Sequence, residues 1–389
     1  MEKFAEALHQ AIHIYPVIAL VFTVLYIGWN YHKYGSIRSL RILIVYSFVM
    51  YMLCVICLVI LPLPSPQEAS ALSGHARQLD PMRCIYDMKS EVGNLVSKSD
   101  ISSWIYLLNS KTFLYTIFNV FMTIPFGMYM KYYFDFGFIE TFFLSFLLTL
   151  VIETSQLTGL FFIFPGNYRM FDVDDIITNT AGGVIGWILG IPLCYILPTR
   201  EEMDEMSYEH GQRVSLMRRA ASFFFDVLLC VIIGAAIWLF FHFAPRIDRL
   251  QPYMTQLEYI KQILKGMNIP VLFALYLIFF SLLTDGQTPG QKITSTRVTL
   301  KNGKRATRTQ CAIRSTLFSV IMILIPWYIF QGIQNISTAT FTEEVLISIV
   351  TGIWLIGCIV MWFRMFLNKP AFYEKASHTR ITSTIKVDE

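Results

Sequence analysis

Long apolar stretches separated by short polar segments dominate the chain. Crossing the hydrocarbon core of a bilayer, roughly 30 Å thick, takes about 20 helical residues. About nine stretches meet that length, near 12–30, 42–62, 112–130, 138–161, 174–197, 222–243, 269–284, 316–334 and 345–366. Strands of a membrane barrel would alternate apolar and polar residues, which these stretches do not. The pattern predicts an all-α polytopic membrane protein.

The composition agrees with this fold class. Hydrophobic residues make up 55% of the 389 residues and charged residues only 15%, whereas charged residues are about a quarter of a typical soluble domain. The net charge is only +4, so the positions of the basic residues matter more than their sum.

Basic residues cluster in segments that a nine-span layout places on one side of the membrane: 31–41, 198–221, 285–315 and the tail after Arg364. Cytoplasmic loops are enriched in lysine and arginine. We therefore expect this side to be cytoplasmic, with the amino terminus outside and the carboxyl terminus inside. A basic cytoplasmic face favours contact with anionic lipid rather than with nucleic acid.

The longest strongly polar stretch between spans begins TREEMDEMSYEHGQRV, after the fifth apolar segment. It predicts a cytoplasmic linker at 198–215 between two membrane modules, 1–197 and 216–389.

Polar residues gather around the fourth and fifth apolar segments of the first module. Glu153 and Gln156 are three residues apart, which places them on one helical face. A charged side chain inside a membrane is costly and usually faces the bundle interior. The next polar residues follow a short loop, at Arg169, Asp172, Asp174, Asp175 and Asn179. We expect these seven residues to form one polar cluster at the outer end of a helical hairpin.

Small residues follow this cluster along the fifth segment. Gly182, Gly186 and Gly190 repeat every four residues, with Gly183 beside them. Small residues at this spacing allow a second membrane helix to approach closely.

Several interpretations of the cluster are open. It is either a folding device, in which Arg169 neutralises an acid and Asp172 or Asp174 caps a helix, or a site that binds a ligand. Asp172, Asp174 and Asp175 form D-x-D-D, which offers oxygen ligands for Mg²⁺ or Ca²⁺. However, no phosphate-binding loop, H-E-x-x-H or G-x-S-x-G motif occurs in the sequence. We expect no catalytic residues, no metal and no cofactor.

The ordered polar positions resemble the VanZ-like family over roughly residues 40–197. The pattern is E-x-x-Q followed by R-x-F-D-x-x-D-x-x-x-N-x-x-G-G-x-x-G, with Phe171 at the aromatic position. This resemblance implies a protein of the Gram-positive cell envelope, in a family associated with low-level resistance to teicoplanin and related lipoglycopeptides.

The second module has its own buried charge. Arg219 stands seven residues before Asp226, a short way inside the sixth apolar segment. Residues seven apart share nearly one helical face, so Arg219 is expected to pair with Asp226. Further on, the alternating segment KITSTRVTL and the turn KNGK predict a small cytoplasmic β-hairpin near 292–308.

These residues resemble the RDD family over about 212–385. Arg219 and Asp226 match its first charged pair, and Gly286, Thr288, Gly290 and Lys292 match its glycine-rich turn. Gln291 stands where a basic residue is common, and Glu374 replaces the late aspartate. Some RDD proteins have been linked to cation/proton exchange.

Two functions remain as hypotheses. The first is a non-enzymatic envelope protein whose outer polar cluster binds a lipid-linked wall precursor or a lipoglycopeptide. The second is a cation/proton antiporter, or another small-solute transporter, that uses Glu153 and Asp226. An intramembrane enzyme is disfavoured because no nucleophile stands beside a base.

Overall fold

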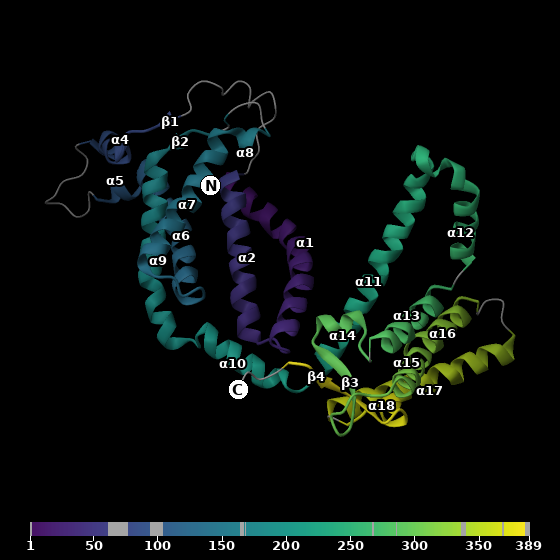
Figure 1. Cartoon of the computed structure of the whole chain (residues 1–389). Helices are drawn as coiled ribbons and strands as arrows, with labels where there is room; N and C mark the ends of the chain where they lie inside the picture. The colour runs from purple at the N-terminus through teal and green to yellow at the C-terminus, as the bar shows by residue number, and fades with distance from the viewer. Residues whose placement is uncertain are drawn as a thin grey trace. The chain divides into compact units, whose positions relative to one another are not determined.

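The computed structural model describes residues 2–60, 77–93, 104–163, 167, 169–266, 268–284, 286–335, 340–367 and 369–385. Helices account for most of them (Figure 1). The first helices are α1 (Glu2–Lys33), α2 (Ser39–Ile60), α4 (Arg83–Val92), α5 (Ile105–Leu108), α6 (Lys111–Tyr132), α7 (Phe138–Leu157), α8 (Gly159–Phe162), α9 (Val173–Ile196) and α10 (Arg200–Gly211). The later ones are α11 (Leu216–Phe243), η3 (Ala244–Arg246), η4 (Asp248–Tyr253), α12 (Met254–Gly266), α13 (Ile269–Leu283), α14 (Pro289–Ile293), α15 (Arg308–Ser319), η5 (Val320–Leu324), α16 (Ile325–Gln334), α17 (Phe341–Phe366) and α18 (Phe372–Ala376).

Within the described residues, eight helices are long and apolar enough to span a membrane. The all-α polytopic class predicted from the sequence is confirmed. The predicted seventh span is too short to cross a bilayer as a single helix. It corresponds to α13, which has only 15 residues and is about 23 Å long at 1.5 Å per residue. It counts as a ninth span only together with 249–264, to which it is bent by 94°.

The chain divides into two compact units. The first contains 1–23 and 38–205, and the second contains 24–37 and 206–389. The division falls inside the polar segment 198–215, of which α10 forms most. The end of α1 belongs with the second unit, where Ser36 Oγ donates to Ser207 O at 2.7 Å and Ser295 Oγ to His32 O at 2.7 Å.

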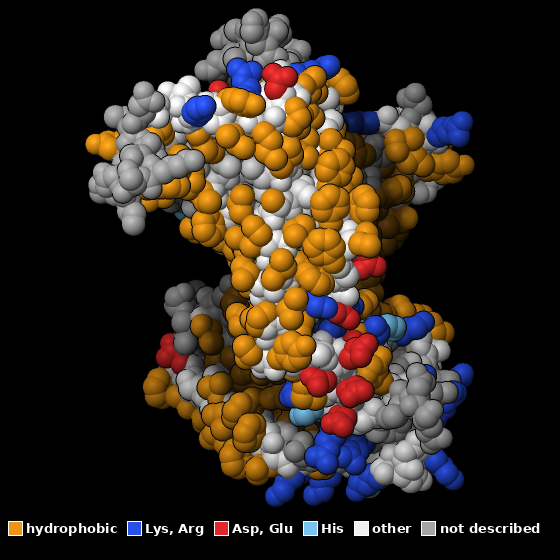
Figure 2. Space-filling model, turned by 90° about the vertical axis from the view of Figure 1, so that its left-hand side faces the viewer, with side chains coloured by type: hydrophobic (Ala, Val, Ile, Leu, Met, Phe, Trp, Pro, Cys, Tyr) orange, Lys and Arg blue, Asp and Glu red, His pale blue; other side chains and the backbone are white. Residues whose placement is uncertain are grey.

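In the first unit, α2, α6, α7 and α9 run side by side, and α4 lies with β1 (Arg77–Gln78) and β2 (Phe171–Asp172) at one end (Figure 1). These two short strands pair in parallel. Figure 2 shows a belt of hydrophobic side chains along the helices of this unit on the face that it presents.

The glycines of α9 form its contact with α6. A Cβ on Gly182 would lie 2.3 Å from Val120 O, and one on Gly186 would lie 2.0 Å from Ile124 O. Gly190 packs in the same way on Lys131, and Gly183 faces Ser145 of α7. Any side chain at these positions would force the helices apart, so the glycine repeat sets their spacing.

In the second unit, a two-stranded sheet joins β3 (Thr296–Leu300) to β4 (Thr379–Ser383). The prediction of a hairpin near 292–308 is therefore wrong about the strand that pairs with β3. The turn after β3 closes with a single bridge, Thr299 to Arg305, and the antiparallel ladder runs to the distant carboxyl-terminal strand. Local alternation identified the strand but could not show a partner about 80 residues away. Residues 289–293 form α14 rather than strand.

Candidate functional site

The acidic cluster consists of Glu153, Asp172, Asp174 and Asp175 and lies where the carboxyl end of α7 meets the amino end of α9 in the first unit. Asp172 holds the two helices together. Its backbone N–H donates to Glu153 Oε2 at 3.0 Å, and its own Oδ1 accepts from Asp174 N at 2.8 Å. Asp172 is thus the N-cap of α9. Burial raises the pKa of the Asp172 carboxyl above its ordinary value.

Asp174 caps a different helix. Its Oδ1 accepts from Met82 N at 2.6 Å and its Oδ2 from Cys84 N at 2.7 Å. These are free N–H groups at the start of α4, where a carboxylate is favoured by the helix dipole. Burial, followed by the negative charge of Asp174, raises the pKa of the Cys84 thiol. Both oxygens of Asp174 are therefore occupied in holding α4 against α9.

The carboxylates of Glu153 and Asp175 accept fewer hydrogen bonds than that of Asp174. Glu153 is 2% exposed and accepts only the Asp172 N–H among the described residues. Asp175 Oδ1 accepts from Asn119 Nδ2 of α6 at 2.6 Å. One turn further along α9, Asn179 is buried and its Oδ1 has no donor within the described chain. Each of these three side chains can therefore accept further hydrogen bonds.

Gln156 and Arg169 tie the cluster to α2. Gln156 Nε2 donates to Val59 O at 3.2 Å, and Arg169 Nη1 donates to the same oxygen at 3.4 Å. Arg169 also acts electrostatically on Glu153 and Asp175. The seven polar residues predicted from the sequence thus lie in one region, though Asp172 and Asp174 have capping roles there.

Metal binding gains no support from this geometry. Across the described residues, no group of three His, Cys, Asp or Glu side chains is placed to hold an ion. The acids of D-x-D-D point to different partners, because Asp172 caps α9, Asp174 caps α4 and Asp175 faces α6.

A second buried acid, Asp226, lies on α11 and is 3% exposed. Its Oδ2 accepts from Thr288 Oγ1 at 2.6 Å, and its Oδ1 accepts from Gly290 N at 2.8 Å and Tyr276 Oη at 3.0 Å. A Cβ on Gly290 would lie 2.1 Å from Ser222 O, so only glycine lets α14 approach α11 this closely. Asp226 is held by uncharged donors alone.

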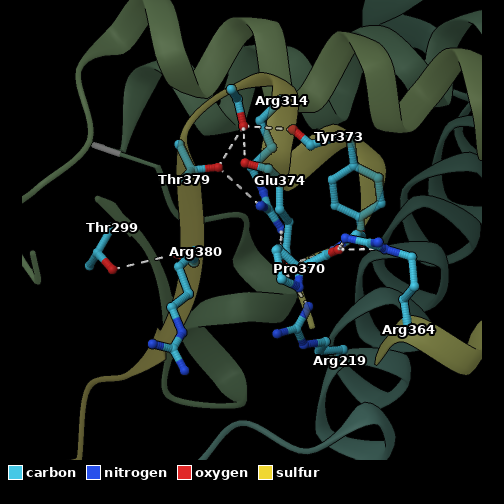
Figure 3. A network of polar contacts seen from close by, with 11 residues as sticks. Arg219, Thr299, Arg314, Arg364, Pro370, Tyr373, Glu374, Thr379 and Arg380 are labelled. Atoms are coloured by element: carbon cyan, nitrogen blue, oxygen red, sulfur yellow. Dashed lines mark hydrogen bonds and ion pairs between the residues drawn. The ribbon is translucent and has the colours of Figure 1, made fainter. Parts of the chain in front are cut away.

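Arg219 does not pair with Asp226, contrary to the expectation from their spacing. Its Nη1 donates to Glu374 Oε1 at 2.8 Å, and Arg314 Nη2 donates to the same oxygen at 3.2 Å (Figure 3). Glu374 Oε2 accepts from Ala371 N at 3.0 Å. The three donors of α14 and α13 already surround Asp226, whereas Glu374 is 1% exposed and requires a cation.

The remaining motif residues have separate roles. Gly286 has φ +84°, which favours glycine. Gln291 Oε1 accepts from Thr288 N at 3.0 Å while Thr288 Oγ1 accepts from Gln291 N, a reciprocal cap for α14. A basic residue at this position could not accept that bond. Lys292 is exposed.

Asp226 and the two arginines that bind Glu374, Arg219 and Arg314, line one cavity of about 90 Å³. Arg219, Asp226, Thr288, Gln291, Arg314 and Tyr373 are among its lining residues. A polar cavity of this size has room for water. The cavity thus joins the two charged groups that the sequence predicted would contact each other directly.

Three contributing residues were missed by the sequence reasoning. Asn119 is a polar residue in an apolar span, and that pattern could have indicated it. Tyr276 and Arg314 gave no comparable signal, because aromatic residues are abundant in the spans and Arg314 stands in a basic loop.

Models of two protein families match the chain in succession. Residues 48–196 are similar to the VanZ/LLP1 family and residues 213–369 to the RDD family. These matches confirm the order of the two resemblances, although the second ends before Glu374. No curated protein and no solved structure matches the chain.

Proposed function

Because the chain joins a VanZ-like membrane module to an RDD-family membrane module, we propose that it is a non-enzymatic protein of the cell envelope. In this proposal the acidic cluster binds a lipid-linked wall precursor or a lipoglycopeptide. Such binding would contribute to teicoplanin-type resistance in a Gram-positive cell.

The observation that carries the proposal is the acceptor capacity left at Glu153, Asp175 and Asn179. All three belong to membrane-spanning helices, where polar groups are costly unless they have a partner or a function. A ligand rich in N–H donors or positive charge would complete their hydrogen bonding. Capping accounts for Asp172 and Asp174 but leaves these three side chains unexplained.

We infer the side of the membrane on which the cluster lies from the basic residues at the start of α2. Arg38 and Arg41 stand at its start, whereas Val59, near its end, accepts bonds from Gln156 and Arg169. The 22 residues of α2 extend about 33 Å, enough to cross a bilayer. Since basic segments favour the cytoplasm, we place the cluster outside, with the carboxyl terminus inside.

Susceptibility to teicoplanin and to vancomycin in a sensitive Gram-positive host tests the proposal. Cells would express the wild-type chain, Glu153→Gln or Asp175→Asn, with membrane levels matched by blotting. Asp135→Asn is the control, because this acid is 85% exposed in its side chain and lies between α6 and α7, away from the cluster. We expect protection from teicoplanin that both cluster variants lose and the control keeps. Equal protection by all variants would contradict a binding role for the cluster.

A second function, cation/proton exchange, is favoured by Asp226. This buried acid lies on the 90 Å³ cavity and has no ion-pair partner within the described residues. It could therefore exchange a proton for a cation without first breaking a salt bridge. Proton flux driven by a cation gradient in proteoliposomes tests this: Asp226→Asn should abolish the flux, and the exposed Glu258→Gln should leave it intact. Flux no greater than in empty vesicles would exclude the exchanger.

A further inference from the structure

A large cleft in the second unit is lined by basic residues. It has a volume of about 760 Å³ and lies between the start of α11, the segment after α17 and strand β4. Its charged lining consists of Arg213, Arg219, Lys301, Lys369, Arg380 and Glu374. Five cations therefore share the cleft with one acid.

The single acid does not balance these cations. Glu374 is already engaged by Arg219 and by Arg314, which lies behind the cleft. In Figure 3, Arg219 and Arg314 lie at Glu374, and the Arg380 side chain lies apart from them. Successive residues of a strand point to opposite sides. Thr379 accepts from Arg314 at 3.1 Å, so Arg380 projects away from the network.

The other cations have no counter-charge in the part of the chain that the structure describes. Arg213, Lys301, Lys369 and Arg380 are all exposed, and none forms an ion pair with a described acid. Like charges gathered in a concave surface create a positive potential that attracts anions. Arginine in particular suits phosphate, because its planar guanidinium donates two parallel hydrogen bonds.

The cleft also lies beside the ends of two membrane spans. Leu216, the first residue of α11, and Met365, in the last turn of α17, are part of its wall. Spans end where the hydrocarbon core gives way to lipid headgroups. The volume is in the range of sites for small ligands, about 300–1,000 Å³. The cleft therefore has the positive charge, the volume and the position at the end of membrane spans that suit a phosphate group at a membrane surface.

We propose that this basic cleft is a binding site for a phosphate-bearing anion. An anionic lipid headgroup and a soluble phosphorylated molecule offer the same recognition chemistry, and the experiment separates them. The proposal is independent of the acidic cluster and of exchange at Asp226.

The test measures binding to the full-length chain in nanodiscs. The first arm uses nanodiscs made of phosphatidylcholine and phosphatidylglycerol. Native mass spectrometry would count the phosphatidylglycerol molecules that the protein retains. The second arm uses nanodiscs made of phosphatidylcholine alone. Calorimetry would measure the binding of inorganic phosphate and of glycerol 3-phosphate to the protein. The cleft variant is Arg213→Gln/Lys369→Gln/Arg380→Gln, which leaves Arg219 and Glu374 intact. The charge-matched control is Lys304→Gln/Arg308→Gln/Lys375→Gln, whose positions are exposed and lie outside the cleft.

We expect the cleft variant to bind at least about tenfold more weakly, since it removes three of the five cations that line the cleft, and the control to change less than about twofold. Loss of phosphatidylglycerol retention alone assigns the site to a lipid headgroup, and loss of glycerol 3-phosphate or phosphate binding assigns it to a soluble anion. Equal weakening of both variants would mean general surface attraction and would overturn the proposal. Unchanged binding in the cleft variant, with thermal unfolding like wild type, would overturn it as well.

Discussion

Arg219 and Glu374 are 155 residues apart in the chain, yet Arg219 Nη1 lies 2.8 Å from Glu374 Oε1. Arg314 donates to the same carboxylate oxygen. One buried acid therefore holds together α11, α15 and α18, and places β4 beside β3. Together with the β3–β4 ladder, this carboxylate attaches the carboxyl-terminal segment to the second unit.

Replacing Glu374 by glutamine should destabilise the second unit. The substitution leaves Arg314, whose side chain is 6% exposed, without a carboxylate. Removing one partner of a buried ion pair costs about 3 kcal/mol. Thermal unfolding of the purified chain in nanodiscs would measure the loss, with the exposed neighbour Lys375→Gln as control. A melting temperature equal to that of the control would show that the pair contributes no net stability.

The glycine repeat of α9 predicts a steric penalty that depends on position. A Cβ on Gly186 would lie 2.0 Å from Ile124 O, so Gly186→Ala must push α6 and α9 apart. Overpacking of this kind typically costs about 1–3 kcal/mol. Gly352, also within a membrane helix, has nothing within 4 Å of its Cβ position. Gly352→Ala should therefore be tolerated, and similar unfolding temperatures for the two variants would contradict close packing at Gly186.

The sequence predicted what local patterns determine. Apolar runs predicted the membrane class and about nine spans, of which eight are single long helices within the described residues, and the spacing of Glu153, Asp172 and Asp175 predicted their proximity. It could not predict partners brought together by folding. Asp174 accepts from Met82 N, 92 residues earlier, and no helical period links them.

The second unit shows the same limit in a different form. Seven-residue spacing predicted that Arg219 pairs with Asp226, whereas the two side chains only line the same cavity. The ion pair forms instead at the acid with fewer uncharged donors, because among the described residues Glu374 accepts only from Ala371 N besides its two arginines. Thr288 and Gly290 supply uncharged donors to Asp226, which leaves Arg219 to Glu374.

Two substitutions at Asp172 should distinguish the role of its side chain as a helix cap from the role of its charge. Asparagine and aspartate are comparable N-caps, whereas alanine costs about 1 kcal/mol. Asp172→Asn should therefore keep α9 intact, and Asp172→Ala should lower the free energy of unfolding. Circular dichroism during thermal unfolding of both variants would measure the difference. Equal destabilisation by asparagine and alanine would mean that capping is not the role of this side chain.

The same residue has a pH dependence of known sign. Burial raises the Asp172 pKa above its ordinary value of 3.8, so the folded state binds this proton more tightly than the unfolded state. Its contribution to stability therefore falls as pH rises from about 3.8 through the raised pKa. Relative to wild type, Asp172→Asn should be more stable at about pH 7 than at about pH 4. The same difference in melting temperature at both pH values would contradict the shift.

Arg218 and Arg219 are adjacent but should lose different amounts of stability on replacement by lysine. Arg218 is 0% exposed, and its guanidinium donates to the carbonyl oxygens of Gly211, Thr294 and Ser295 at 2.7–2.8 Å. A lysine ammonium has three donors on one atom and cannot reach carbonyls spread around a planar fork. Arg218→Lys should leave buried carbonyls unpaired and cost about 1–3 kcal/mol for each one. Arg219→Lys can still place a charge beside Glu374, and Arg314 keeps its own bond to that carboxylate, so this variant should lose less stability than Arg218→Lys. Thermal unfolding of the two variants measures the difference, and equal losses would mean that the forked geometry of Arg218 is not what holds the Gly211 and Thr294–Ser295 segments together.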